Sequence, residues 1–177
     1  MSRQAVSTIV LVVVVLLVYR AMRSGWQART RRSSALLPAL PVPPAGLGAE
    51  RLAPVDAVYV STTRSGDWLD RVTAYGLGVR SPAQVGVFDA GVQITRQGAT
   101  DLSVPTTALR GASGAPGMAG KVVGGEGLVV VTWQGDPADP RGLDTGLRPK
   151  HAADHARLID AITTLTAGQA PAQEENS

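Results

Sequence analysis

The sequence predicts an α+β protein that is mainly β: a partly open β-barrel capped by a C-terminal helix and preceded by one N-terminal transmembrane helix. An uncharged apolar run, a series of short strand-like stretches separated by turn residues, and one amphipathic helical pattern at the end indicate this fold. We expect five parts: a tail (1–4), a transmembrane helix (5–22), a basic juxtamembrane segment with a proline-rich linker (23–54), a globular domain (55–167) and a disordered tail (168–177).

The apolar run is the transmembrane candidate. Residues 6–19 read VSTIVLVVVVLLVY, so a helix of them has no polar face. A bilayer core of about 30 Å requires about 20 helical residues, and the span 5–22 approaches that length. A cleaved secretory signal is the alternative, but Arg20 and Arg23 follow where a signal has small residues at its cleavage site.

Basic residues gather behind this run. Arg3 precedes it, and the arginines that follow it are Arg20, Arg23, Arg29, Arg31 and Arg32. The positive-inside rule then predicts a single-pass plasma-membrane protein with its N-terminus outside and its C-terminal domain in the cytoplasm. We expect the same five arginines to contact the anionic inner leaflet. Residues 51–167 carry eleven basic and eleven acidic side chains, which argues against a nucleic-acid partner.

The linker, residues 33–54, contains five prolines and is expected to be an extended spacer. A ligand for an aromatic-lined peptide groove is the alternative interpretation of residues 37–44.

Short strands are expected through the globular domain. Residues 57–62, 83–88, 92–96, 128–134 and 143–147 are rich in strand-forming side chains. Asp89-Ala90-Gly91 predicts a hairpin between the second and third of these. Residues 143–147 are expected to pair with residues 128–134, and Trp133 is expected in the core. Residues 101–104 and 108–112 fit either two short strands or one strand bent at Pro105. Residues 65–77 fit either one or two helical turns or an irregular excursion, with their apolar side packed against the domain. Residues 151–166 predict the closing helix, with an apolar face formed by Leu158, Ile159, Ile162 and Leu165.

No pattern indicates catalysis. The glycine-rich residues 111–121 lack the spacing of a phosphate loop, because Ala115 and Val122 stand where glycine and a hydroxyl residue are required, so we expect a surface loop. Ser113 lacks the nucleophile-elbow motif G-x-S-x-G, because Ala115 replaces its second glycine.

A helix would place His151, Asp154 and His155 on one face, as a metal site needs. Their position in a first helical turn, where Asp154 complements the helix dipole, is the preferred interpretation. We therefore predict no enzyme, no cofactor and no metal, and retain Arg64, Arg110 and Lys121 as candidate binding residues.

A resemblance to a known family rests on five stretches in this order: GDWLDRVTAYGLGVRS, VFDAGVQITRQGATDLSVPTTALRGA, GMAGKVV, GLVVVTWQ and LDTGLRP-x-HAADH. Together with the preceding span they resemble actinobacterial single-pass membrane proteins with a bacterial pleckstrin-homology-like (PH-like) domain. The resemblance implies a PH-like barrel, and such proteins are also described as export or transporter proteins. It does not extend to phosphoinositide recognition, since Arg64 is the only basic residue between Val55 and Asp70.

The predicted function is a membrane-anchored, non-catalytic binding or scaffold module that presents a cytoplasmic PH-like domain to a protein or lipid partner. The alternative is an accessory subunit of a membrane transport or export complex, in which the span packs against a larger partner.

Overall fold

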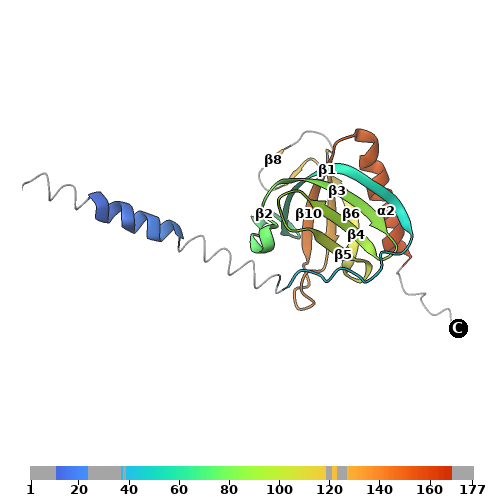
Figure 1. Cartoon of the computed structure of the whole chain (residues 1–177), viewed down its shortest axis with the longest axis horizontal. Coiled ribbons are helices and arrows are strands. Elements are labelled where there is room, and N and C mark those ends of the chain that lie inside the picture. Colours follow the sequence, from blue (N-terminus) through green and yellow to red (C-terminus); the bar gives the residue numbers. More distant parts are fainter. Residues whose placement is uncertain (1–10, 24–36, 38, 119–120, 123–126, 169–177) are drawn as a thin grey trace, which may run out of the picture.

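The computed structural model describes residues 11–23, 37, 39–118, 121–122 and 127–168 (Figure 1). The predicted tail at 1–4, three of the juxtamembrane arginines (Arg29, Arg31 and Arg32) and nearly all of the C-terminal tail lie outside these residues. Residues 11–23 form a helix with exposed side chains. In the described part of the chain, no helix is both long enough and apolar enough to cross a membrane. The predicted span begins at residue 5, and its first six residues are not among those described.

The domain is a curled antiparallel sheet with the strand order β5-β4-β3-β1-β10-β9-β6, and β2 pairs with β1 at its side. Its strands are β1 (Glu50–Arg64), β2 (Asp67–Arg71), β3 (Ser81–Phe88), β4 (Gly91–Arg96), β5 (Leu102–Pro105), β6 (Leu109–Ala115), β9 (Leu128–Trp133) and β10 (Leu143–Pro149). The short strands β7 (Gly117–Met118) and β8 (Lys121–Val122) pair separately, and η1 (Ala74–Gly76) and η2 (Thr106–Ala108) are single 3₁₀ turns. Because β1 pairs with β3 along its first part and with β10 along its second, it joins the two halves of the barrel.

The helix α2 (Ala152–Ala167) packs beside the sheet and closes the barrel (Figure 1). Leu158 and Ile162 are fully buried in the core, whereas Ile159 and Leu165 are partly buried against it. Trp133 and Tyr59 are the largest fully buried side chains. These positions confirm the mainly β fold with a C-terminal helix, the buried Trp133 and the predicted apolar helix face.

Two strand pairs appear where the sequence predicts them. β3 and β4 form the hairpin around Asp89-Ala90-Gly91, and Gly91 has the positive φ (141°) that favours glycine. β9 pairs with β10, and Trp133 lies opposite Leu143. The ambiguous region at 65–77 is resolved as the short strand β2 followed by the single turn η1.

The glycine-rich stretch is not entirely a loop. Residues 111–115, which we expected in a surface loop, complete β6, and Ser113 lies opposite Val130 of β9. A register shift between Leu109 and Gly111 starts this part of the strand, and Gly111 has a φ of 155° there. Sheet pairing gives the backbone of these small residues hydrogen-bond partners that a glycine-rich composition does not predict.

The domain also begins earlier than predicted. β1 starts at Glu50, inside the predicted linker, and runs through Pro54 where its register with β3 shifts between Leu52 and Val55. Such an irregularity accommodates a proline, which has no N–H for the sheet ladder. Leu37 is fully buried in the core beside Gly135 and Leu143, so residues from the predicted spacer are part of the folded unit.

Candidate functional site

Side chains fill the interior of the barrel, so the candidate sites lie on its outside. A groove of about 320 Å³ lies over the outer face of β3 and β4. It is lined by Pro43, Leu47, Pro54, Gln84, Gly86, Phe88, Gln93 and Thr95. Its volume is at the lower end of the range of about 300–1,000 Å³ that is typical of small-molecule pockets.

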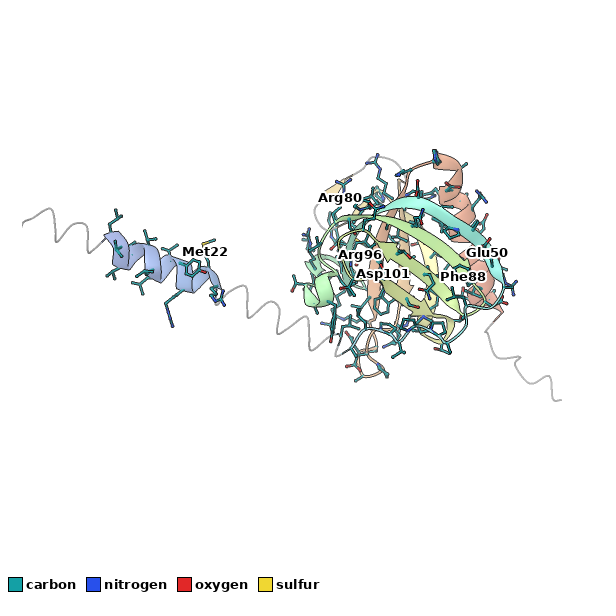
Figure 2. All side chains as sticks on the ribbon, viewed as in Figure 1. Met22, Glu50, Arg80, Phe88, Arg96 and Asp101 are labelled. Atoms are coloured by element: carbon teal, nitrogen blue, oxygen red, sulfur yellow. The ribbon has the colours of Figure 1, made fainter. Side chains whose placement is uncertain are left out.

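The pairing of β3 with β4 forms the floor of this groove. Gln84 lies opposite Thr95 and Gly86 lies opposite Gln93, so alternate residues of both strands point to the same outer face. Gly86 lets the Phe88 ring lie across the strand, because a Cβ atom at residue 86 would lie 2.8 Å from Cε2 of Phe88. Figure 2 shows Phe88 at the Glu50 end of the strands, away from Arg96.

The groove residues are uncharged, and two of them are oriented by neighbours. The Gln93 amide donates to Ser103 Oγ (2.6 Å), and the Gln84 amide donates to Asp56 Oδ1 (3.3 Å). A hydrogen bond from Lys150 to Asp56, followed by the one from Gln84, lowers the pKa of that carboxyl. The arrangement suits a neutral group with an apolar part, held by amide and hydroxyl contacts.

Two of the predicted binding residues, Arg64 and Arg110, contact the same loop, residues 134–142. Arg64 Nη2 lies 3.2 Å from Asp139 Oδ2. Arg110 Nη1 donates to the carbonyls of Pro140 (2.8 Å) and Arg141 (3.0 Å), and Arg110 Nη2 donates to Gln134. Both arginines therefore hold the loop in place with the groups that we expected to hold a ligand.

Asp139 is partly buried, and burial acts to raise its pKa. Hydrogen bonds from Arg64 and from the backbone N–H of Arg141 outweigh this effect, so the pKa of Asp139 is below its ordinary value. The third predicted binding residue, Lys121, opens β8, which pairs with β7. The structure thus brings Arg64 and Arg110 to one loop and places Lys121 on another element.

The candidate metal residues Asp154 and His155 have different partners. Asp154 accepts a hydrogen bond from Arg157 (2.9 Å), while His155 Nε2 lies 3.1 Å from the carbonyl of Leu128. Among the described residues, no group of His, Asp and Glu has an arrangement that can hold a metal ion.

Arg96 is a buried structural residue that the sequence analysis does not single out. Its side chain is buried, and its guanidinium donates to Ser81 Oγ (3.1 Å) and to the carbonyls of Gly76 (3.1 Å), Val79 (2.7 Å) and Thr100 (3.1 Å). It also lies 3.8 Å from the centre of the Tyr59 ring. Burial lowers the pKa of Arg96, although a guanidinium remains protonated in proteins. The strand alternation Val92, Ile94, Arg96 could have revealed it, because it places Arg96 on the inward face.

A second surface feature is the projecting lobe formed by residues 65–80, which contains β2 and η1. Val72 is buried as expected, but Trp68, Leu69 and Tyr75 are exposed. The prediction that residues 65–77 pack their apolar side against the domain is therefore wrong for Trp68, Leu69 and Tyr75, whereas Val72, Ala74 and Leu77 are buried. Trp68 and Leu69 are exposed because β2 pairs only with the end of β1, so both faces of this strand reach solvent.

The curled sheet, the filled interior and the closing helix together define a PH-like domain rather than an open β-sandwich. Residues 37–163 match the model of a family described as bacterial PH domain-like, and the match covers more than two thirds of the chain. The chain belongs to the bacterial PH domain-like family. No curated protein matches it. The matched region supports the PH-like part of the resemblance and begins at Leu37, after the predicted anchor.

Proposed function

We propose that this protein is a membrane-anchored, non-catalytic binding module that presents its PH-like domain to a partner at the cytoplasmic face of the plasma membrane. The groove over β3 and β4 is the observation that carries this proposal. It is a concave, uncharged surface on a domain whose interior is filled, and the family match indicates a binding fold. A short neutral segment of a protein partner suits it best.

The anchoring part of the proposal rests on the sequence. Residues 11–19 and Met22 are apolar and exposed in the helix, as they would be in contact with lipid. Arg20 and Arg23 follow the apolar run, and Arg29, Arg31 and Arg32 continue the basic segment. Their charge favours the cytoplasmic side and the anionic leaflet.

The test uses the full-length chain in its own membranes. A photo-cross-linking amino acid is placed at Thr95, an exposed residue on the rim of the groove, or at Ala156, an exposed residue of α2. We expect a discrete protein adduct from Thr95 that is absent from Ala156 and is lost when Gly86→Leu displaces the Phe88 ring and fills the groove. Identical adducts from the two positions, or no adduct from Thr95, would contradict the proposed binding surface.

One further measurement addresses the anchor. Carbonate extraction of the same membranes tests the anchor: we expect the chain to stay in the pellet. Arg64→Ala and Arg110→Ala are poor tests of ligand contact, because each also releases the 134–142 loop.

One observation favours the accessory-subunit alternative. The helix at residues 11–23 exposes apolar side chains around its circumference, which suits packing against another membrane helix as well as lipid. Replacing the span with an unrelated apolar helix separates the two functions. The binding module keeps its Thr95 adduct after this change, whereas an accessory subunit loses its partner.

A further inference from the structure

The lobe at residues 65–80 carries four exposed apolar side chains within twelve residues of sequence. The exposed fractions are 51% for Trp68, 66% for Leu69, 42% for Tyr75 and 58% for Val79. Trp68 and Tyr75 combine a large apolar ring with a polar group. Exposed apolar side chains grouped in this way are typical of a surface that contacts a partner or a membrane.

The lobe is held rigidly rather than being a loose loop. The Thr62 N–H donates to the carbonyl of Leu77 (2.9 Å), and the Val72 N–H donates to the carbonyl of Thr62 (2.9 Å). The Arg96 guanidinium donates hydrogen bonds to the carbonyls of Gly76 and Val79 in the lobe. These contacts surround Tyr75, whose φ of 53° is unusual for a residue other than glycine. The fold thus maintains a strained backbone in the segment that exposes Tyr75.

The lobe lies at the end of the barrel where the N-terminal segment enters. Ser65 N–H donates to the carbonyl of Gly142 (3.0 Å), and the neighbouring Leu143 contacts Gly135 beside the buried Leu37. Figure 1 shows β2 and the turn η1 together at this end. Thirteen residues, 24–36, separate Leu37 from the helix at 11–23, so a fully extended chain joins them over at most about 50 Å.

We propose that this lobe rests in the interfacial region of the phospholipid bilayer and orients the domain with its tethered end toward the membrane. The inference rests on the proposed anchoring. Trp and Tyr side chains are favoured at the headgroup level of a bilayer. Asp67 and Asp70 offset Arg71 and Arg80 in the lobe, so apolar contact rather than net charge provides the attraction.

The experiment measures tryptophan quenching in the full-length chain. Trp26→Phe leaves Trp68 in the lobe and Trp133 in the core, and Trp133 is fully buried. The variant is reconstituted into vesicles of phosphatidylcholine and phosphatidylglycerol whose acyl chains carry bromine near the headgroup. Flotation of the vesicles shows separately whether the chain is anchored.

A control tryptophan is placed at the opposite end of the domain. Ala156 is exposed on α2 next to His155, which contacts Leu128, and Leu128 is at the end of β9 remote from Trp133. The control chain combines Trp26→Phe, Trp68→Phe and Ala156→Trp. It measures the quenching that a tethered domain shows without interfacial contact.

We expect the Trp26→Phe chain to float, its emission to shift to the blue in vesicles, and bromine to quench it. Trp68→Phe should remove nearly all of this quenching, and the Ala156→Trp control should restore none. A floating chain whose Trp68 is no more quenched than the control overturns the inference and leaves the lobe for a protein partner. A chain that does not float overturns the anchoring, and the inference with it.

Discussion

Replacing Arg96 by methionine should destabilise the barrel and release the lobe. Methionine keeps much of the apolar length of the side chain but removes four hydrogen bonds, to Ser81, Gly76, Val79 and Thr100. Gly76 retains a second donor, the Val79 N–H, whereas the substitution removes the guanidinium donors of the Val79 and Thr100 carbonyls. These two contacts determine most of the expected loss.

The expected magnitude follows from these contacts. A buried acceptor left without a partner costs about 1–3 kcal/mol, and two of them set an upper range of about 2–6 kcal/mol. Removing a buried cation returns part of this cost, because the guanidinium no longer has to be desolvated. The residues whose carbonyls lose a donor, Val79 and Thr100, are solvent-accessible. We therefore expect Arg96→Met to lower the free energy of unfolding by about 2–3 kcal/mol. For a domain of this size that corresponds to a Tm decrease of about 10 °C.

The assay is thermal unfolding of the full-length chain in detergent micelles, followed by the near-ultraviolet circular dichroism of the buried Trp133. Amide hydrogen exchange gives the local effect: Val79 N–H should lose protection, because its acceptor, Gly76, belongs to the turn that Arg96 holds. Arg148→Met on the exposed face of β10 is the matched control and should change Tm little. An Arg96→Met variant within about 0.5 kcal/mol of the parent chain, the range of an ordinary surface substitution, would refute the reasoning.

Three further predictions concern titration and the domain boundary. Burial raises the pKa of Tyr59 from 10.0 to about 12. The stability that the neutral phenol gives the folded state is therefore fully present below pH 10 and is lost as pH rises to about 12. Two pKa units correspond to about 2.7 kcal/mol; the unfolding free energy of Tyr59→Phe, measured by denaturant titration at successive pH values, should therefore fall less steeply over this range. The pKa of Asp139 is lowered, which gives stability above its ordinary value of 3.8 that is lost as pH falls through the folded value. Asp139→Asn should accordingly show a weaker acid dependence of its urea midpoint, and an unchanged dependence would contradict the role of its pair with Arg64. Leu37→Ala should cost about 2–5 kcal/mol because this side chain is fully buried, whereas a loss below 0.5 kcal/mol in chemical unfolding would exclude residue 37 from the folded unit.

The sequence contains the information for the regular parts of the fold. The apolar residues of β9 require burial on both faces, and the glycine after Asp89 and Ala90 permits a tight turn. Leu158 and Ile162 recur at helical spacing and reach the core. These features depend on local periodicity and on one turn, which a single sequence shows directly.

The remaining features depend on long-range contacts. Leu37 is one leucine in a proline-rich tract, and only the position of Gly135 and Leu143, about a hundred residues later, makes it a core residue. Arg64 and Arg110 look like free cations in the sequence, but a loop that is distant in the chain supplies a carboxylate partner to Arg64 and carbonyl partners to Arg110. A sequence pattern gives the type of a side chain but does not identify its partner.

The early start of the domain changes how the proposed anchor would act. A fully extended spacer over the predicted linker, residues 33–54, would add about 3.1 Å per residue, or nearly 70 Å, between membrane and domain. Residues 39–49 instead run along the barrel, and Leu47 and Ala49 accept hydrogen bonds from Ala90 and Asp89. The chain between the helix and Leu37 then has at most about 50 Å of reach. A long rigid spacer would keep the lobe away from lipid, whereas this shorter connection enters the domain at the end that exposes Trp68. Leu37 and the base of the lobe lie at the same end of the barrel, so a tether that enters at Leu37 would hold the lobe toward the membrane.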